Sequence, residues 1–302
     1  MNQTNQTDID VVVGVPPKKK LLTVWEKILY SNPAIEPQTI ISQLSGKTII
    51  ITGASFGIGR ALALLLGCAH THLILVARSE EQLLKLKNQI IDTNPNSNIS
   101  IFTADLRQVE QIETLIIQIK EISPKGIDVL INNAGKSICR SFFNSLDRFH
   151  DTTRLIAINF YAPVQLISGL SNELIKRKGQ IINISAINVL LAPTPYWAAY
   201  QSSKSALDQW FRCITPELEN TGVRCSIVYL PLVKTRMIEP NPAYRNMPAM
   251  TAEQAAKVII HVLIHRKKRY EPWWLPVGQL FSVLFSRIWQ NLCQYYLKNR
   301  KK

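Results

Sequence analysis

From Lys47 onward, short β-branched apolar runs alternate with longer segments of helical period, and this alternation is the strongest constraint on the fold. Strands are predicted at 47–52, 72–77, 98–103, 127–131, 179–184 and 224–230. Helices are predicted at 57–67, 79–92, 107–121, 152–177, 198–217 and 252–264. Parallel strands of one sheet need crossover connections, which the intervening helices supply. The sequence therefore predicts an α/β fold: a single doubly wound, Rossmann-type parallel sheet with helices on both faces.

A glycine-rich turn joins the first predicted strand to the first predicted helix, in the run Thr52-Gly-Ala-Ser-Phe-Gly-Ile-Gly-Arg60. Gly53 permits a tight turn, Gly57 lets the backbone approach a pyrophosphate, and Gly59 allows close packing of helix on strand. The free N–H groups of the helix N-terminus suit anionic oxygens. We therefore expect a dinucleotide to contact Gly53, Ser55, Gly57, Ile58 and Gly59.

The second predicted strand ends in Arg78, where a site for NAD(H) usually places an acidic residue against the ribose hydroxyls. A guanidinium instead favours the 2′-phosphate of NADP(H). Arg60, near the start of the first helix, either adds a second positive charge to this site or is a solvated surface group. The sequence therefore favours NADP(H) as the coenzyme.

The chain is strongly basic, with 35 Lys and Arg residues against 21 Asp and Glu and a net charge of +14. Much of the excess lies in short clusters, at Lys18–Lys20, Lys176–Lys178, Arg266–Arg269 and Lys298–Lys302. Such clusters are usually solvated surface, but their field also attracts phosphate-bearing ligands or an acidic membrane face. No nucleic-acid-binding motif accompanies the charge, so nucleic acid is not expected as a partner.

The 5 cysteines form neither a paired framework nor CxxC clusters, so no metal site is expected and a reducing compartment is indicated. The first seventeen residues carry no Lys or Arg and precede no long apolar run. Neither a secretory signal nor a membrane-spanning helix is predicted there. We expect a cytoplasmic location.

Two extensions flank the predicted domain, which spans residues 46–269. Residues 1–45 form the N-terminal extension, in which the apolar-rich segment from Leu21 to Tyr30 suits a helix packed on the domain. Residues 270–302 form the C-terminal extension. Pro272, Pro276 and Gly278 are expected to break the start of that extension, so only its second half is predicted to be helical.

The C-terminal extension carries seven large aromatic side chains between Trp273 and Tyr296, followed by a basic end. Aromatic and basic residues together are typical of a membrane interface. A terminal helix that covers the substrate pocket, or one that contacts another subunit, explains the same pattern. Peripheral membrane contact through this segment is therefore one of three expectations for it.

Three motifs resemble those of the short-chain dehydrogenase/reductase family in order and approximate separation: Thr52-Gly-x-x-x-Gly57-x-Gly59, Asn132-Asn-Ala-Gly135 and Tyr200-x-x-x-Lys204. The resemblance runs from about Gly46 to Arg269. By this resemblance Asp105 lies beside the adenine, Asn132 near the adenosine ribose and Thr235 beside the nicotinamide amide. The family usually has Gly where this chain has Leu232, so the resemblance does not fix the backbone conformation at this position. The resemblance also implies a homo-oligomer.

The chemistry expected by the resemblance is hydride transfer to a carbonyl, in which negative charge develops on oxygen. Tyr200 supplies a proton-donating phenol, and Lys204, on the same helical face, lowers the pKa of that phenol and holds the nicotinamide ribose. Asn159 matches the family asparagine that orders a water on the proton path. These residues, together with a serine hydroxyl, make up the expected catalytic group.

The expected serine is displaced, because the family position thirteen residues before the tyrosine holds Ile187 and Ser185 lies fifteen before it. Aligning through Asn183 instead pairs the usual serine with Ala186 and requires a one-residue insertion before Tyr200. Either Ser185 has shifted into the role of oxyanion donor, which we favour, or the serine donor is missing.

Three longer stretches, at 145–151, 175–185 and 229–237, are similar to the bacterial fatty-acyl-CoA reductases that supply aldehydes or alcohols for lipid synthesis. The leading hypothesis is therefore an NADPH-dependent reductase of a lipid-like carbonyl, with a fatty acyl-CoA or a fatty aldehyde as substrate. A reductase or dehydrogenase of another ketone, steroid or alcohol is the alternative enzyme. A hypothesis of another class is a pseudoenzyme that binds NADPH without turnover, because the usual serine is absent.

Overall fold

The computed structural model describes residues 24–30, 33–238, 244 and 247–299. Most of the predicted N-terminal extension, including the cluster Lys18–Lys20, lies outside the described residues, as do the last three residues of the basic C-terminal end.

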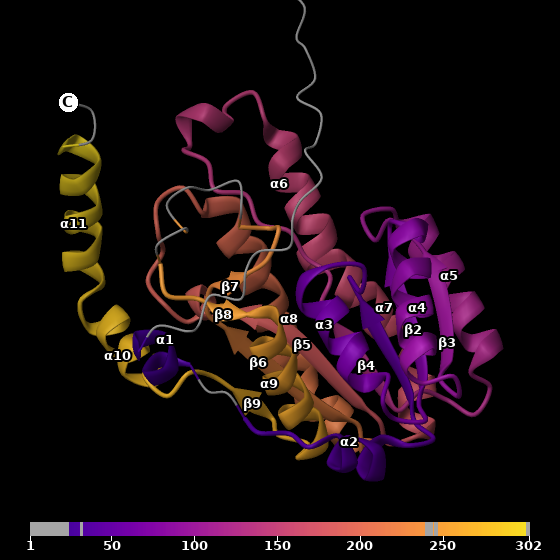
Figure 1. The fold of residues 1–302 in the computed structure, drawn as a ribbon. Coiled ribbons are helices and arrows are strands. Elements are labelled where there is room, and N and C mark those ends of the chain that lie inside the picture. Colours follow the sequence, from indigo (N-terminus) through magenta and orange to yellow (C-terminus); the bar gives the residue numbers. More distant parts are fainter. Residues whose placement is uncertain (1–23, 31–32, 239–243, 245–246, 300–302) are drawn as a thin grey trace, which may run out of the picture.

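A seven-stranded parallel sheet runs through the centre of the chain in the order β3-β2-β1-β4-β5-β6-β9 (Figure 1). The strands are β1 Thr48–Thr52, β2 His72–Ala77, β3 Asn98–Thr103, β4 Val129–Asn132, β5 Gln180–Ala186, β6 Arg224–Leu230 and β9 Arg269–Tyr270. The order reverses between β1 and β4, and ligands of such sheets bind at the carboxyl ends of strands beside that reversal. The predicted fold class, a doubly wound parallel sheet, is confirmed.

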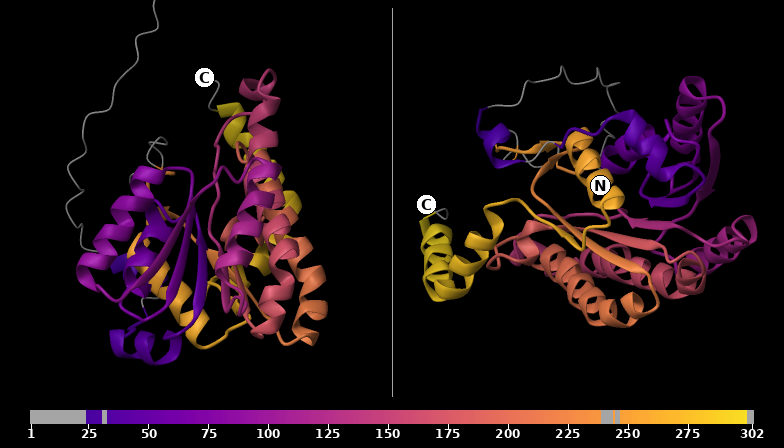
Figure 2. Two further views of the ribbon diagram at one scale, coloured as in Figure 1. Left: turned by 90° about the vertical axis from the view of Figure 1, so that its right-hand side faces the viewer. Right: turned by 90° about the horizontal axis from the view of Figure 1, so that it is seen from below.

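Helices cover both faces of the sheet, as the view from below in Figure 2 shows. The main ones are α2 Pro37–Leu44, α3 Gly57–Leu66, α4 Glu80–Thr93, α5 Val109–Ile122, α7 Ala162–Lys176, α8 Ala198–Asn220 and α9 Ala252–Ile264. One core cluster joins α2, α3, α4 and α9 to the sheet, and the second joins α5, α7 and α8 to its other face. Ile49 and Ile51 enter the first cluster and Ile50 the second, because successive side chains of a strand point to opposite faces. A continuous apolar run is therefore what a strand of this sheet needs.

The six predicted strands lie within two residues of the observed bounds, whereas three two-residue strands were not predicted. These are β9 and the pair β7 Val233–Lys234 and β8 Met250–Thr251. The predicted helix at 152–177 is divided into α6 Phe149–Ile156, a π-helical segment η2 Ala157–Tyr161, and α7. The spacing of apolar residues does not reveal a one-turn π segment, because the helices on both sides of it keep the helical pattern.

The prediction that only the second half of the C-terminal extension is helical is wrong. Two helices occupy it, α10 Leu275–Leu284 and α11 Ser286–Asn299. Pro276 lies in the first turn of α10, where no backbone N–H is needed for an intrahelical bond. Gly278 lies within α10, where a Cβ would make an ordinary van der Waals contact with Leu191 Cδ2 at 3.4 Å, and the helix continues through it.

A short helix, α1 Val24–Leu29, joins the N-terminal extension to the loops that follow β6 and to the C-terminal extension. Glu26 is buried, and its carboxylate lies 2.5 Å from Lys234 Nζ and accepts the backbone N–H of Ala249 at 3.1 Å. Trp273 and Trp274 donate their indole N–H groups to the carbonyls at the end of α1. The α1 helix thus fastens the segment after β7 and the C-terminal extension to each other.

We predict that Glu26→Gln lowers the free energy of unfolding by about 1–3 kcal/mol, because it leaves the Lys234 ammonium and the Ala249 amide without a buried acceptor of matching charge. Urea denaturation measures the change. Glu81→Gln is the matched control, since Glu81 also lies 2.5 Å from a lysine, Lys85, but both side chains are exposed. Equal denaturation midpoints for the two variants would contradict the fastening role of Glu26.

Candidate functional site

The glycine turn after β1 is held by backbone contacts too close for any side chain. Gly53 and Gly57 have φ values of +68° and +56°, in the left-handed region that favours glycine. A Cβ on Gly59 would lie 2.3 Å from the carbonyl oxygen of Gly53. The turn therefore brings its backbone to the N-terminus of α3, the position at which the sequence predicts a phosphate cradle.

Thr52, the last residue of β1, ties this turn to the end of β4. Its hydroxyl accepts the backbone N–H groups of Asn133 and Ala134, both at 3.0 Å, and donates to the carbonyl of Ile131 at 3.2 Å. The Asn133 side chain donates back to the carbonyls of Thr52 and Gly53. The first two predicted motifs thus form one hydrogen-bonded unit at the reversal of the sheet order.

Asn132, predicted near the adenosine ribose, is buried in the sheet, and its Nδ2 donates to Asn183 Oδ1 of β5 at 2.8 Å. Within the described part of the chain, Asn132 Oδ1 and Asn183 Nδ2 have no hydrogen-bond partner. Buried polar atoms of this kind require an explanation, and a polar ligand at the strand ends supplies one.

The predicted coenzyme-selecting end of β2 presents Arg78 as an exposed cation. Asp105, predicted beside the adenine, is bound by both Nε and Nη2 of Arg107, and these hydrogen bonds lower its pKa, with a smaller contribution from the charge of Arg78. The Arg60 guanidinium donates instead to Gln89 of α4 at 2.6 Å. Arg107 was missed in the sequence analysis, although a cation two residues after Asp105 is a readable signal.

Tyr200 and Lys204 lie in the first two turns of α8 and come together with Asn159 of η2. Lys204 is buried, and its Nζ donates to the carbonyl of Ile184 on β5 at 2.8 Å. Asn159 Nδ2 donates to the Ser203 hydroxyl at 2.9 Å, and that hydroxyl donates to the carbonyl of Tyr200 at 2.7 Å. The third motif and the predicted asparagine therefore belong to one buried polar network.

Gly135 brings the end of β4 into the same network. A Cβ on Gly135 would lie 3.0 Å from Asn159 Oδ1 and 3.5 Å from Lys204 Nζ. The carboxamide of Asn159 also bonds both backbone groups of Lys136, which follows Gly135. All three predicted motifs thus meet at the carboxyl ends of β1, β4 and β5.

Ser185 lies near the end of β5, one residue after the carbonyl that binds Lys204. Its hydroxyl is buried and has no hydrogen-bond partner among the described residues. Asn188, in the 3₁₀ turn after β5, also has a buried Oδ1 without a partner among the described residues, but only its Nδ2 could donate to an oxyanion. The loop before Tyr200, in which one of the two alignments places an extra residue, contains Tyr196 at φ +73°, a strained conformation for a tyrosine. This strain fits a loop that has been redirected by an insertion.

Thr235, predicted beside the nicotinamide, lies against the glycine turn, since a Cβ on Gly57 would come 3.0 Å from Thr235 Cγ2. Leu232, which stands where the family usually has Gly, does not adopt a left-handed backbone conformation. The carbonyl of Leu232 instead accepts the N–H of Met250 beside the β7–β8 pair. Leucine is therefore compatible with the backbone at this position.

Burial raises the pKa of Tyr200 to about 12 and lowers that of Lys204 to about 8. This corrects the expectation that Lys204 lowers the pKa of the phenol. The lysine ammonium is directed to the Ile184 carbonyl, and desolvation dominates at Tyr200, where the Trp197 ring lies edge-on at 5.6 Å between centroids. A raised pKa keeps the phenol protonated at neutral pH, which suits a proton donor.

The residues present fit a dinucleotide. The glycine turn has no side chain between its backbone and the N-terminus of α3, Arg78 supplies a cation at the end of β2, and Lys204 supplies a buried ammonium beside β5. Ser185, near the end of β5, and Tyr200, in the first turn of α8, provide hydroxyls. Among the described residues, no group of three His, Cys, Asp or Glu side chains could hold a metal ion.

Comparisons with known proteins agree with this geometry. The family model described as short chain dehydrogenase matches residues 47–246. A fatty acyl-CoA reductase of Acinetobacter baylyi is 40% identical over 244 residues, covering 80% of this chain and 80% of that protein. A fatty acyl-CoA reductase of Mycobacterium tuberculosis is 37% identical over 266 residues, covering 84% and 89%.

Solved structures show the same fold. A short-chain dehydrogenase from Sphingobium yanoikuyae in complex with NADPH superimposes with a TM-score of 0.70 at 23% identity, covering 82% of this chain and 95% of that one. A metagenomic short-chain oxidoreductase in complex with NADP gives a TM-score of 0.64 at 26% identity, covering 76% and 97%.

We predict that the affinity for NADPH falls as the pH rises above about 8, by at most about tenfold per pH unit, because the lowered pKa of Lys204 removes its positive charge there. Fluorescence titration from neutral to alkaline pH measures the dissociation constant. Lys204→Met should bind weakly with little pH dependence, and Lys204→Arg, which stays charged, should lose the alkaline decline. An alkaline decline that persists unchanged in Lys204→Met would contradict the assignment to this lysine.

Proposed function

Since the chain belongs to the short-chain dehydrogenase family of NAD(P)-dependent oxidoreductases, we propose that it is an NADPH-dependent reductase of a lipid-like carbonyl, with a fatty acyl-CoA or a fatty aldehyde as substrate. The observation that carries the proposal is the identity of 37–40% with two fatty acyl-CoA reductases over four-fifths of the chain or more. The buried Lys204 and Ser185 and the partly buried Tyr200 support it, because a carbonyl reductase needs a cation, a proton donor and an oxyanion donor together.

The coenzyme, when bound, supplies a hydride to the carbonyl carbon. Tyr200 remains a neutral phenol at physiological pH and gives its proton to the carbonyl oxygen as charge develops there. Lys204, which keeps its charge below about pH 8, would hold the ribose hydroxyls of the bound coenzyme. Asn159 positions α8 through Ser203 and the carbonyl of Tyr200.

Ser185 is proposed as the second donor to the carbonyl oxygen, since its buried hydroxyl lacks a partner within the described residues. With a thioester, the hydride and the Tyr200 proton would give a hemithioacetal, and its carbon–sulfur bond would break as the hydroxyl proton passes to the departing sulfur, releasing an aldehyde and the coenzyme A thiol. After exchange of NADP⁺ for a second NADPH and reprotonation of Tyr200 from solvent, the same hydride and proton transfer would convert the aldehyde to an alcohol. The aromatic rings of Trp197 and Tyr244, 5.9 Å apart beside Tyr200, offer an apolar wall for such a substrate.

The test is a screen of the purified full chain that follows NADPH oxidation with long-chain acyl-CoA thioesters, fatty aldehydes, ketones and ketosteroids, and NADP⁺ reduction with steroid-like alcohols. The proposal expects turnover with the thioester or the aldehyde. Turnover confined to ketones or steroids would assign the alternative enzyme. NADPH binding without turnover of any substrate would assign the pseudoenzyme. A homo-oligomer, a cytoplasmic location and membrane contact remain predictions from the sequence.

We predict that the chain binds NADPH more tightly than NADH and that Arg78→Ala weakens NADPH binding by about 10–100-fold, because a guanidinium–phosphate pair is lost. NADH binding should hardly change. Parallel titrations with both coenzymes provide the measurement, and Arg60→Ala is the matched control, because its guanidinium is engaged by Gln89. Tighter binding of NADH than of NADPH to the unmodified chain would reverse the assignment.

We also predict that Ser185→Ala lowers kcat by about 10²–10³-fold, the usual cost of losing one oxyanion donor, with nearly unchanged NADPH affinity. Steady-state kinetics give the value. Ser226→Ala is the matched control, because that serine is equally buried on the adjacent strand but bonds Lys267 and Gln180. Tyr200→Phe should abolish most activity. Full activity of Ser185→Ala together with a low kcat of Asn188→Ala would contradict this prediction and assign the oxyanion donor to Asn188.

A further inference from the structure

The first helix of the C-terminal extension has its apolar face turned away from the protein. On α10, the side chains that are more than half exposed are all apolar: Val277, Leu280, Phe281, Val283 and Leu284. The opposite side of the helix holds Gly278 and Ser282, whose hydroxyl accepts the backbone N–H of Ala192 at 3.0 Å. A helix on a water-facing surface has the reverse arrangement, so the outer face of α10 is built for an apolar environment.

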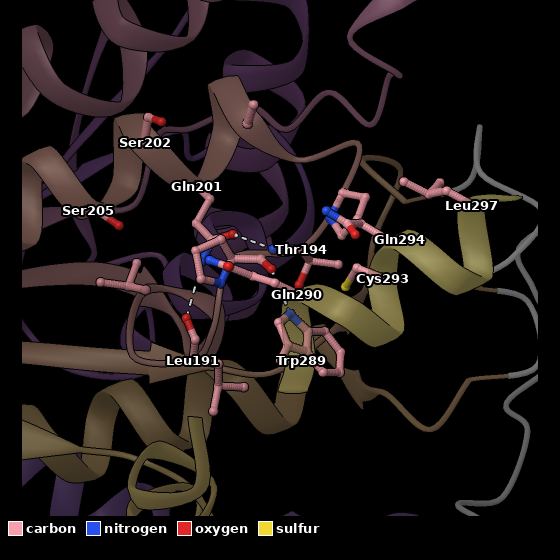
Figure 3. A pocket seen from close by; sticks show the side chains of 14 residues that line it. Leu191, Thr194, Gln201, Ser202, Ser205, Trp289, Gln290, Cys293, Gln294 and Leu297 are labelled. Atoms are coloured by element: carbon pink, nitrogen blue, oxygen red, sulfur yellow. Dashed lines mark hydrogen bonds between the residues drawn. The ribbon is translucent and has the colours of Figure 1, made fainter. Parts of the chain in front are cut away.

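The second helix, α11, divides into three stripes at helical spacing. Trp289, Cys293 and Leu297 face the body of the protein and line a cavity of about 740 Å³ against the loop that follows β5 (Figure 3). A second, exposed stripe is apolar and consists of Ile288, Leu292, Tyr295 and Tyr296. The third stripe is polar and basic and consists of Arg287, Asn291 and Lys298. An exposed apolar stripe beside a basic one is the pattern of helices that lie in a membrane interface.

Specific hydrogen bonds fix both helices in this orientation. Trp289 donates its indole N–H to the carbonyl of Pro193 at 2.8 Å, and Trp274 donates to Leu29 at 3.3 Å. Leu275, at the start of α10, is fully buried in the second core cluster. The exposed faces of α10 and α11 are therefore presented outward by a docked segment.

The charge of this segment complements an anionic surface. From Pro272 to the last residue the chain contains no Asp or Glu, whereas it contains five cations: Arg287, Lys298, Arg300, Lys301 and Lys302. Within the described residues, no helix is long and apolar enough to cross a bilayer. A segment of this composition suits binding parallel to the surface of anionic lipid, where apolar side chains enter the headgroup boundary.

A second apolar surface lies at the same end of the molecule. The loop after β4 contains a 3₁₀ turn, η1 Phe143–Ser145, and this loop together with the first residue of α6 exposes Phe142, Phe143, Leu146 and Phe149 by 67–75%. Both this loop and the loop that Trp289 contacts follow carboxyl ends of neighbouring parallel strands, where the candidate site lies. Figures 1 and 2 show η1 and the end of α11 at the same end of the molecule.

We propose that the exposed faces of α10 and α11 form a docking surface for an anionic lipid bilayer and hold the carboxyl end of the sheet, with the candidate site, at the bilayer surface. The argument rests on the outward apolar faces, the absence of acidic residues after Glu271 and the position of η1, and it does not depend on the identity of the substrate.

The test is co-sedimentation of the full chain with vesicles of phosphatidylcholine, with and without phosphatidylglycerol. We expect binding that is stronger to the anionic vesicles. Leu280→Gln with Leu284→Gln should weaken it by about tenfold or more, because two apolar side chains lose their burial in lipid. Leu84→Gln with Ile117→Gln is the control, since it removes exposed apolar side chains from α4 and α5 without affecting the docking surface.

A second pair of variants tests the charge. Arg287→Gln with Lys298→Gln should reduce binding to anionic vesicles by about fivefold per cation and leave binding to phosphatidylcholine nearly unchanged. NADPH titration verifies that each variant is folded.

Three outcomes would overturn the proposal. The first is absence of vesicle binding by the unmodified chain, and the second is equal binding by the leucine variant and its control. The third is a dimer that dissociates in the leucine variant while vesicles leave the unmodified chain in solution, which would assign this surface to a second copy.

Discussion

The close approach of backbone at the reversal of the sheet order is the constraint on which the rest of the structure depends. Gly53 lets the turn pass the start of the segment after β4, since a Cβ there would lie 2.9 Å from Ala134 Cα. Thr52 then accepts two N–H groups from that segment. These contacts bring the phosphate cradle and the motif after β4 into one rigid unit, against which α8 places its lysine and tyrosine. A side chain at Gly53 or Gly59 would separate these parts.

A second constraint is the burial of polar groups between β4, β5, η2 and α8. The π-helical segment rotates Asn159 into the space beside Gly135, where its carboxamide bonds the backbone of Lys136 and the hydroxyl of Ser203. π segments interrupt regular helices most often at functional sites. The network is satisfied at Asn159 and Lys204, whereas Asn132, Ser185 and Asn188 each keep one buried polar atom without a partner in the described chain. The unsatisfied atoms lie at the carboxyl ends of the strands, where a ligand would complete them.

The parts of the fold that sequence alone predicts are those encoded locally. The strands are recognisable as short apolar runs. The glycine turn and the Tyr200–Lys204 pair are recognisable because each motif lies within a few consecutive residues. The parts that sequence misses depend on distant contacts. The structural role of Glu26 cannot be predicted from sequence because its partners, Lys234 and Ala249, are more than 200 residues away. The strand β9 has only two residues, too few for a recognisable pattern, and is defined by its pairing with β6. The pKa of Tyr200 was expected to fall because the charge of Lys204 is close in sequence, but the burial that raises it is a tertiary property. Pro276 does not break the helix, because it lies in the first turn of α10, where proline is accepted.

The central claim is that this site passes a hydride from NADPH to the carbonyl carbon of a fatty acyl group. The most direct measurement uses NADPH that carries deuterium at C4 of the nicotinamide, with a long-chain acyl-CoA as acceptor, and analyses the product by mass spectrometry. The account predicts an aldehyde or alcohol that carries deuterium at the former carbonyl carbon, and no such product with Tyr200→Phe. Coenzyme that binds and keeps its deuterium, with the thioester unchanged, would contradict it.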